Sequence, residues 1–447
     1  MKSTYCVLDY GAVADGKTND AASIQKAVDA CAAAGGGRVV IPAGRTVLSG
    51  SFELRSRVDF HVSEDATLVS TTNLDSFARQ VFSSGEEVDK RLWIGCRDAD
   101  DVTLSGTGTI DGQCHGFIVD EQDSEYIYKH TQRWRPAMTC FENVRRISVR
   151  DLTFRNAANW TLHFSGCVDV DVSHVKIFND LKFPNADGID PDHCRRVRIS
   201  DCHIVSADDC IVLKNTASFA QYGPCEDIEI TGCRLESVSS AFKIGSESVD
   251  AFRRVRMSNC VIERSNRGLA IQLRDGGNVE DIEFRNIEIE TKRFAPYWWG
   301  AGEAIYVTAL PRNAQTTGGS VRNVRFHDIR CRGENGIVVY GGPAGRIEGV
   351  RFERVSVDIV RHTTWESGLF DLRPCCAGFL PPDSKPAGDD TPWGRPVMRA
   401  CAAISVDGAN AVHFDGVEYS LPAKDTAPWT GLRTTGGTTG EPKRNIQ

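Results

Sequence analysis

The sequence predicts an all-β protein built as a parallel β-helix, on two observations. A short phrase recurs along the chain, for example as VRRISVRDLTF from Val144 and as CRRVRISDCHI from Cys194. Each copy alternates apolar and polar residues, which is the period of a strand and not of a helix. The copies are also spaced by about the length of one coil, so we expect them to stack as neighbouring strands.

The middle apolar residue of each phrase marks one coil. These residues recur in steps of 23 to 31 residues, with one longer step of 42, and they are Ile147, Val170, Val197, Ile228, Val255, Ile282, Val324 and Val350. Leucine-rich repeats share this period, but their Leu/Asn consensus is absent and the intervening segments show no helical pattern. A propeller needs longer units with four antiparallel strands each. The β-helix is therefore preferred.

A second strand in each coil shows the same alternation, over residues 208–214, 241–245 and 269–274. Its apolar residues are expected to face inward. The residues between them then face outward on one sheet surface, among them Lys243, Ala270, Gln272 and Arg274. This surface is the candidate cleft.

The expected organisation is a single β-helix domain over residues 1–433, followed by a loose tail at 434–447. Within the domain we expect an N-terminal cap at 1–50, a Trp-containing cleft loop at 290–312, and C-terminal loops with the final strands at 358–433. A cap is needed because an open coil would expose its core and its edge strands.

The N-terminal cap is predicted to contain a short helix. Asn19 and Asp20 are suited to begin it, and it is expected to run to about Ala34 with Ile24, Val28 and Cys31 as its apolar stripe. The three glycines at 35–37 are expected to end it.

Composition excludes some classes of partner. The chain is 41% hydrophobic and 25% charged, with a net charge of −8. Such a balance gives no bulk attraction to nucleic acid or to anionic membranes, so neither is expected as a partner. The first residues lack the features of a secretory signal, and no apolar run has the length of a membrane span. The expected location is cytoplasmic, or secreted or periplasmic if a signal has been removed.

Three aspartates carry the most information about function. Asp187 is followed by Asp208 and Asp209 after 21 and 22 residues, a spacing that would place all three on neighbouring coils. Hydrolases that attack a glycosidic bond with water need such a cluster, because one carboxyl donates a proton while another accepts one. The sequence therefore indicates a glycosidase, and no cofactor is expected.

Several separated motifs resemble glycoside hydrolase family 28, the polygalacturonase family. They are VLDYGAVADGKTNDAASIQKAVDACAAAGGGRVVIPAG from Val7, GTGTIDGQ from Gly106, NADGID from Asn185 and ADDCIVLK from Ala207. The resemblance implies a right-handed parallel β-helix, no metal, and hydrolysis with inversion. It also implies that Asp208 is the general acid, that Asp187 and Asp209 hold and deprotonate the attacking water, and that Asn185 belongs to the same site.

Two departures from the family pattern concern the substrate. Val238-Ser239-Ser240 stands where the family usually has Gly-His-Gly, and Ala270-Ile271-Gln272 stands where it has Arg-Ile-Lys. In typical members the missing cations hold a galacturonate carboxylate by charge-assisted hydrogen bonds. Cleavage of plain polygalacturonate is therefore not expected.

Lys243 and Arg274 are candidates to supply the missing cations from new positions. The alternative is that they pair with Glu247 and Asp275 as ordinary charges, and the sequence leaves both alternatives open. Gln272 is kept as a candidate for substrate binding on the same face.

The segment PYWWGAGEAIYVTALPR, at 296–312, explains the long step between coils. Its adjacent Trp298 and Trp299 are candidates for a platform on which sugar C–H groups stack, and the alternative is that they anchor a lid. Glu303 is a candidate for binding sugar hydroxyls, or it is structural.

The leading hypothesis is an exo-acting, inverting glycosidase on pectin-derived or related oligosaccharides, with a rhamnogalacturonan-like or other non-homogalacturonan linkage favoured. Polysaccharide lyases are the second class, since they also form β-helices and often use calcium that an acid cluster could hold. A non-catalytic carbohydrate-binding β-helix is the third. The sequence does not predict the oligomeric state.

Overall fold

The computed structural model describes most of the chain. The described residues are 3–79, 91–120, 130–131, 135–296, 298–375, 378, 380, 385–386, 397–399, 401–423 and 429–445. They fall into two compact units, the first of residues 1–208 and 216–223, the second of residues 209–215 and 224–447. The single domain expected over 1–433 stays a prediction.

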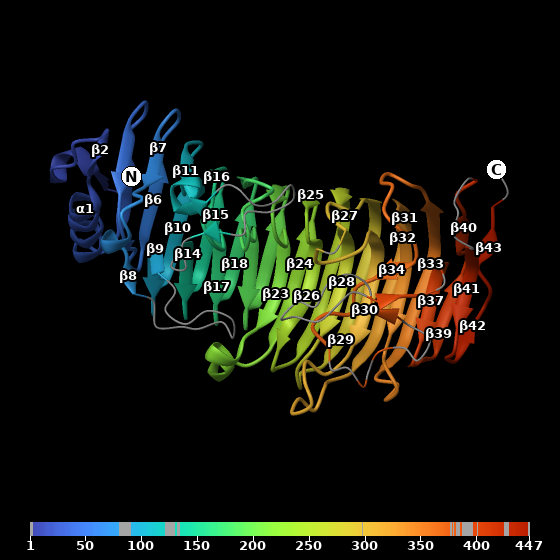
Figure 1. Cartoon of the computed structure of the whole chain (residues 1–447). Helices are drawn as coiled ribbons and strands as arrows, with labels where there is room; N and C mark the ends of the chain where they lie inside the picture. The colour runs from blue at the N-terminus through green and yellow to red at the C-terminus, as the bar shows by residue number, and fades with distance from the viewer. Residues whose placement is uncertain are drawn as a thin grey trace. The chain divides into compact units, whose positions relative to one another are not determined.

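Unit 1 consists mainly of parallel strands in two sheets (Figure 1). The strands of its long sheet are β1 (Thr4–Cys6), β2 (Asp15–Asn19), β3 (Gly37–Ile41), β4 (Thr46–Ser49), β6 (Val58–Val62), β7 (Thr67–Ser70), β10 (Asp100–Ser105), β11 (Thr109–Asp111), β15 (Arg145–Arg150), β16 (Thr153–Arg155), β18 (Val168–Ser173), β19 (Lys176–Phe178), β21 (Arg195–Ser200) and β22 (His203–Ser206). Those of its second sheet are β5 (Phe52–Glu53), β9 (Arg91–Arg97), β14 (Pro136–Glu142), β17 (Leu162–Ser165) and β20 (Ile189–Asp192), with β8 (Ala78–Arg79) antiparallel to β9. β12 (Ile118–Asp120) and β13 (His130–Thr131) form a separate antiparallel pair.

Unit 2 repeats this arrangement. The strands of its long sheet are β24 (Cys225–Thr231), β25 (Arg234–Ser237), β27 (Phe252–Ser265), β29 (Val279–Thr291), β31 (Val321–Gly333), β33 (Ile347–Ile359), β38 (Ala409–Asn410), β39 (Val412–Asp415), β40 (Glu418–Ser420), β42 (Thr438–Thr439) and β43 (Lys443–Arg444). Those of its second sheet are β23 (Ile211–Asn215), β26 (Ser240–Ser248), β28 (Arg267–Leu273), β30 (Glu303–Ala309), β32 (Asn335–Tyr340), β37 (Ala402–Asp407) and β41 (Thr430–Thr434). A small antiparallel sheet holds β34 (Leu369–Phe370), β35 (Lys385–Pro386) and β36 (Val397–Met398).

The register of the coils follows the apolar residues that mark each repeat. In unit 1, Ile147 pairs with Val170, and Val170 pairs with Val197. In unit 2 the same residue of each coil is in register from Ile228 to Val350. All of these side chains are buried. The predicted parallel β-helix pairing is therefore confirmed within each unit.

The interior of unit 2 contains a column of stacked phenylalanines. The rings of Phe284 and Phe326 are 4.9 Å apart between centroids, those of Phe326 and Phe352 are 5.0 Å apart, and those of Phe352 and Phe414 are 5.5 Å apart. The column forms because residues in register on neighbouring parallel strands lie directly above one another. Offset-stacked rings at this spacing add to the stability that burial provides.

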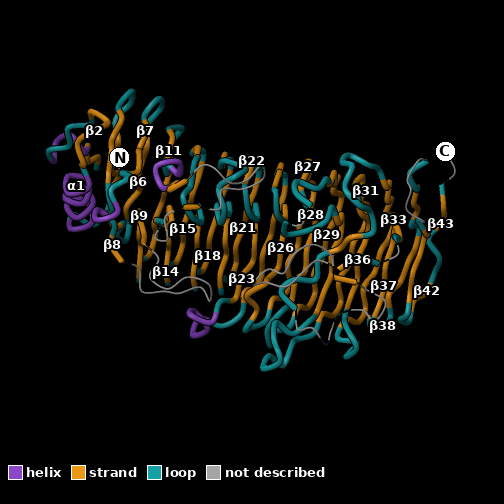
Figure 2. The backbone as a smooth tube through the Cα atoms, viewed as in Figure 1, coloured by secondary structure: helices purple, strands orange, loops and turns teal. Residues whose placement is uncertain are grey.

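The expected N-terminal helix is present as α1 (Ala21–Ala33) (Figure 2). The helix buries the side chains of Ile24, Val28 and Cys31. Asp20 precedes it without capping it, since its carboxylate accepts hydrogen bonds from the main-chain N–H groups of Val13 and Ala14, both at 2.9 Å. Gly35 and Gly36 follow the helix with φ of +92° and +108°, a backbone region that favours glycine.

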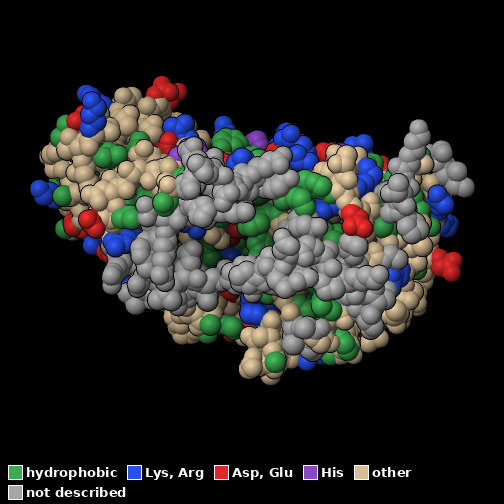
Figure 3. Space-filling model, in the orientation of Figure 1, with side chains coloured by type: hydrophobic (Ala, Val, Ile, Leu, Met, Phe, Trp, Pro, Cys, Tyr) green, Lys and Arg blue, Asp and Glu red, His purple; other side chains and the backbone are tan. Residues whose placement is uncertain are grey.

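The remaining helices described are short 3₁₀ turns. They are η1 (Val7–Tyr10), η2 (Leu74–Ser76), η3 (Cys114–Phe117) and η4 (Ala217–Tyr222). None of the helices in the described part of the chain is both long enough and apolar enough to cross a membrane. Basic and acidic side chains are interspersed on the face seen in Figure 3.

The loose tail expected at 434–447 is corrected for the residues described up to 445. Within this segment, β42 pairs with β39 and β43 pairs with β40, all in parallel. The main-chain N–H of Lys443 donates to the carbonyl of Val417 at 2.9 Å. The prediction failed because the segment is polar, whereas a strand at the end of a coil needs only main-chain partners and no apolar face.

Candidate active site

Asp187 and Asp208 lie together in unit 1. Asp187 is in the turn before β20 and is 2% exposed, while Asp208 follows β22 and is half-buried. One carboxylate oxygen of each lies within 4.8 Å of the other. Two carboxyl groups at this separation do not both ionise easily, so one of them tends to keep its proton. The pair therefore suits one proton donor and one proton acceptor.

Asp209 is the next residue in the chain and the first residue of unit 2. It is 1% exposed. Its Oδ1 accepts hydrogen bonds from the Ser239 hydroxyl at 3.0 Å and from the main-chain N–H of Ser240 at 3.1 Å. Its Oδ2 accepts from the Lys243 ammonium at 2.5 Å. Ser239, which stands where the family usually has histidine, therefore contributes to the site because its hydroxyl donates to Asp209.

The charges around Asp209 set its pKa. Burial alone would raise the pKa of Asp209, but the positive charges of Lys243 and Lys214 outweigh that effect and hold the pKa below its ordinary value. Lys214 also forms an ion pair with Glu247 at 3.5 Å. Burial would likewise raise the pKa of Glu247, and the charge of Lys214 is the main influence that lowers it to about 2.

Lys243 lies on the outward side of β26, as the alternation predicts. Its side chain is 14% exposed and pairs with Asp209. It therefore faces the acids, and among the described contacts Glu247 pairs with Lys214 instead. Asp275, the other acid considered as a partner, pairs with Arg312 at 3.0 Å.

Asn185 is held in unit 1 by an arginine that the sequence did not single out. Arg135 donates to the side-chain oxygen of Asn185 at 2.9 Å and to the carbonyls of Pro184 and Ala158 at 2.6 and 3.0 Å. Asn185 has a φ of +56°, so the guanidinium supports a strained turn beside Asp187. Arg135 and Asn185 are 50 residues apart, and no local pattern connects them.

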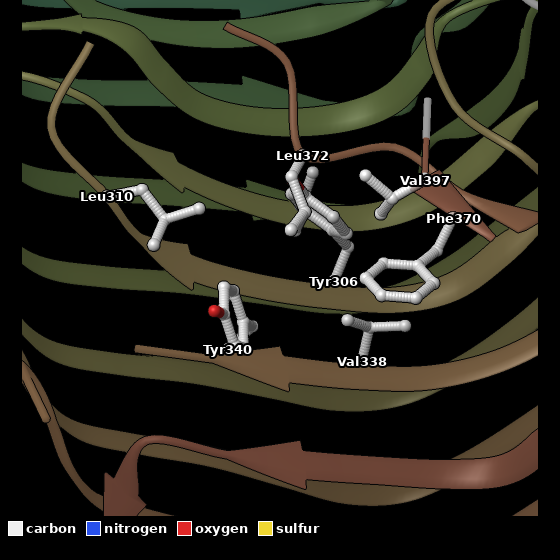
Figure 4. Close-up of a cluster of buried hydrophobic side chains, with 8 residues drawn as sticks. Tyr306, Leu310, Val338, Tyr340, Phe370, Leu372 and Val397 are labelled. Carbon is white, nitrogen blue, oxygen red and sulfur yellow. The ribbon is translucent and has the colours of Figure 1, made fainter. Parts of the chain in front are cut away.

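The outward row that begins at Lys243 is covered further along the sheet. In register with Lys243 are Ala270 on β28, Tyr306 on β30 and Val338 on β32. Residues 369–375, the covering segment, lie across these strands. Figure 4 shows Leu372 against Tyr306 and Phe370 beside Val338, in one buried apolar cluster with Ala270.

The structure corrects the prediction that Gln272 and Arg274 face an open cleft. Gln272 lies on β28 and Arg274 directly follows it, but the two side chains are 4% and 0% exposed because the covering segment lies over them. The Gln272 amide donates to the carbonyl of Arg373. The Arg274 guanidinium donates to five acceptors, which are the carbonyls of Leu273, Leu372 and Pro374 and the hydroxyls of Tyr306 and Thr308.

Glu303 is also buried, at 0% exposure, so its predicted contact with sugar hydroxyls is corrected as well. Its carboxylate accepts from the main-chain N–H groups of Ala301 at 2.7 Å and Asp371 at 3.0 Å. It also pairs with Arg267, whose guanidinium lies over the Tyr306 ring. Glu303 therefore fixes the covering segment to β30, which is the structural alternative left open by the sequence.

Trp298 and Trp299 are half-buried and attached to the covering segment. Their rings are 6.3 Å apart between centroids in a T-shaped arrangement. The guanidinium of Arg373 lies 4.8 Å from the centre of the Trp299 ring and donates to the Trp298 carbonyl at 2.9 Å. Arg373 in turn pairs with Asp371 at 2.8 Å. These contacts agree with an anchoring role, and a role in stacking on sugar stays a prediction.

The missing cations of the Arg-Ile-Lys motif have a structural explanation. Ala270 belongs to the apolar cluster beneath the covering segment, where a long charged side chain would have no room. Gln272 donates to the Arg373 carbonyl through its amide. Neither Asp371 nor Arg373 was identified from sequence, because both lie about 100 residues from their partners on β28.

Carboxylate oxygens as close as those of Asp187 and Asp208 are also ligands that a hard cation such as calcium accepts. Acidic groups also occur together in proteins without an ion. The arrangement by itself therefore fits either an acid–base pair or a cation ligand set.

A family model for glycosyl hydrolases family 28 matches residues 31–376. The chain belongs to this family. The resemblance seen in the sequence is thus confirmed. The match includes Asp187, Asp208 and Asp209 as well as the covering segment.

Curated relatives are polygalacturonases of plants. A probable polygalacturonase of Vitis vinifera is 29% identical over 65% of this chain and 62% of its own length. Polygalacturonase-2 of Solanum lycopersicum is 25% identical over 64% of this chain and 60% of its own length. The chain thus spans about three fifths of the length of these relatives.

Solved structures with a similar fold include two exopolygalacturonases. That of Yersinia enterocolitica aligns with a TM-score of 0.72 at 14% identity, over 98% of this chain and 78% of its own. That of Thermotoga maritima aligns with a TM-score of 0.66 at 20% identity, over 80% of this chain and 87% of its own. At these identities the likeness shows the fold alone, and it confirms a right-handed parallel β-helix.

Replacing Arg274 is expected to loosen the covering segment. In Arg274→Met the carbonyls of Leu372 and Pro374 lose their donors, so we expect the free energy of unfolding to fall by about 3 kcal/mol. We also expect faster hydrogen exchange in peptides that contain residues 369–375. Denaturant unfolding and exchange mass spectrometry measure the two effects.

The matched control for this prediction is Arg330→Met. The Arg330 side chain is 80% exposed and pairs with Glu288 on the surface. Its replacement is expected to change the stability by less than about 1 kcal/mol. Unchanged exchange of residues 369–375 in Arg274→Met would contradict the anchoring role of Arg274.

Proposed function

We propose that this protein is an exo-acting glycoside hydrolase that cleaves pectin-derived or related oligosaccharides. A rhamnogalacturonan-like or other non-homogalacturonan linkage is favoured. In this proposal Asp208 protonates the leaving oxygen, and Asp187 and Asp209 hold and activate the attacking water. Membership of the family and the closeness of Asp187 to Asp208 support this assignment.

The covering segment carries the proposal of end-directed action. Within unit 2 the outward row is accessible at Lys243 and is buried from Ala270 to Val338. A polysaccharide chain that follows this row away from Asp209 would reach the covered part at Ala270 on β28, and beyond it Leu372 and Phe370 over β30 and β32. The chain end, and not an internal stretch, is therefore the part of a substrate that this face accepts.

The pairing of cations supports the proposed substrate class. A guanidinium or ammonium that grips a uronate carboxylate needs N–H groups that are not already committed to the protein. All five N–H groups of Arg274 donate to the protein beneath the covering segment, and the positive charges of Lys243 and Lys214 are balanced by Asp209 and Glu247. A neutral or deoxy sugar beside the scissile bond is compatible with these commitments.

Inversion is proposed from the family resemblance, although the spacing of the acids does not argue for it. Inverting glycosidases generally separate their two carboxyl groups by about 6.5 to 9.5 Å so that water fits between them. The closest oxygens of Asp187 and Asp208 lie within 4.8 Å. The proposal therefore needs Asp209 as a second holder of the water, and the anomer formed must be measured directly.

The remaining expectations about cellular context are also proposals. The partner is an oligosaccharide, and a cytoplasmic location would favour short imported fragments over intact polymer. Neither nucleic acid nor membrane is proposed as a partner.

Product profiles test the end-directed action. With defined rhamnogalacturonan, xylogalacturonan and galacturonan oligosaccharides, we expect one small product to be released from the first minutes while the longer fragments shorten by one unit at a time. Chromatography with mass detection resolves this ladder. Early products of intermediate length would contradict exo action, and products with unsaturated ends would indicate a lyase instead.

The anomer formed first tests the stereochemistry. For an inverting enzyme, proton NMR taken before mutarotation is expected to show only the anomer opposite in configuration to the cleaved bond. Asp208→Asn is the matched control, since it keeps the shape of the side chain but cannot donate a carboxylic proton and is expected to lose about 100-fold in kcat. Initial release of the anomer with the original configuration would contradict inversion.

A further inference from the structure

The carboxylate of Asp209 is surrounded by donors inside unit 2. The Ser239 hydroxyl and the Ser240 N–H bind Oδ1, and the Lys243 ammonium binds Oδ2. Asp209, Ser239 and Ser240 are at most 3% exposed, and the side chain of Lys243 is 14% exposed. These donors stabilise the charged form of Asp209, whereas an acid that takes and releases a proton has to be stable in both forms.

A proton acceptor needs an oxygen that is basic enough to take the proton of the water it activates, and hydrogen bonds and an adjacent cation make a carboxylate less basic. On Asp209 both oxygens already accept hydrogen bonds, and the bond from Lys243 is a short ion pair of 2.5 Å. Protonation of Asp209 would break this pair and leave the Lys243 ammonium facing a neutral acid. The surroundings therefore favour a carboxylate that stays charged.

The charged groups near Asp209 come from three places. Lys243 and Glu247 lie on β26, Lys214 lies on β23, and Asp208 precedes Asp209 in the chain. The two lysines and the two acids Asp209 and Glu247 balance in charge. Burial raises the pKa of Asp209, and Lys243 is the first of the charges that lower it.

We propose that Lys243 is a positioning residue that holds Asp209 as a permanent carboxylate, which orients the attacking water and takes no proton during turnover. This inference rests on the proposed function in taking Asp209 as part of the hydrolytic site. It assigns the ammonium of Lys243 to Asp209 and not to the sugar. Asp209 is then a fixed anion, and Asp187 and Asp208 are the two acids whose protonation changes during turnover.

The proton balance of the reaction then involves two groups. Asp208 gives its proton to the leaving oxygen as the glycosidic C–O bond breaks. The attacking water forms the new C–O bond and gives its proton to Asp187. Asp187 ends protonated and Asp208 ends ionised, and exchange with solvent restores the starting state. Asp209 is a carboxylate throughout.

Lys243→Met tests this role through the pH profile of kcat. Without the ammonium, burial dominates and the pKa of Asp209 is expected to rise, so the acidic limb moves to higher pH by about 1 to 3 units. At neutral pH kcat is expected to fall about 100-fold. Lys243→Arg keeps the charge and is expected to recover most of the activity with the acidic limb of the unchanged protein.

Unfolding measurements test the same role without substrate. In the unchanged protein the folded-state pKa of Asp209 is lowered, so its stabilisation is present above the unfolded pKa of about 4 and is lost as pH falls. In Lys243→Met the folded-state pKa is raised, so stability is instead lost as pH rises. The stability difference between the two proteins is therefore expected to grow from about pH 3 to pH 7. Lys443→Met, at an exposed lysine on β43, is the control and is expected to show a constant small difference.

Two results would overturn the inference. One is a stability difference for Lys243→Met that does not change with pH, and the other is an acidic limb that stays in place in an active Lys243→Met protein. If the unchanged protein cleaves none of the oligosaccharides, the proposed function fails while the unfolding comparison still decides the role of Lys243. If Lys243→Met does not fold, Asp209→Asn combined with Lys243→Met should fold, because no unpaired buried charge remains. Failure of this double variant as well would show that Lys243 is needed for packing and would contradict the proposal.

Discussion

The packing of the covering segment in unit 2 depends on one interaction, the hydrogen bonds that the buried guanidinium of Arg274 donates. Arg274 is fully buried and its five N–H groups all donate to oxygens. Two of these oxygens are carbonyls of the covering segment, and two are hydroxyls on β30. Without the covering segment this charge would lack acceptors, and without Arg274 two buried carbonyls would lack donors.

From this constraint follows the character of the neighbouring face. The covering segment places Leu372 and Phe370 on the outward row, so Ala270 there is small, and the Gln272 amide donates to the Arg373 carbonyl. The covering segment thus occupies the space in which the cations of the Arg-Ile-Lys motif would otherwise lie. On the uncovered part of the row, the ammonium of Lys243 forms an ion pair with Asp209.

Much of the fold could be predicted because parallel coils repeat one short local pattern. The apolar residue of each phrase, from Ile228 to Val350, is in register along unit 2 because each phrase carries the same period-two alternation. The closeness of Asp187 to Asp208 follows from the same stacking. The exposure predicted for Gln272 and Arg274 was wrong. Exposure depends on residues 369–375, which are about 100 residues away and show no repeat.

The central claim is that the cations of the outward row are already paired with groups of the protein, and a matched pair of substrates tests it most directly. The two oligosaccharides would be identical except that the sugar on the leaving side of the scissile bond carries either a carboxylate or a neutral group in its place. Because the cations of the outward row are committed to Asp209, Glu247 and the covering segment, the account predicts kcat/KM for the neutral substrate equal to or above that for the uronate. A preference of about 100-fold or more for the uronate, equivalent to about 2.7 kcal/mol of charge-assisted binding, would contradict it.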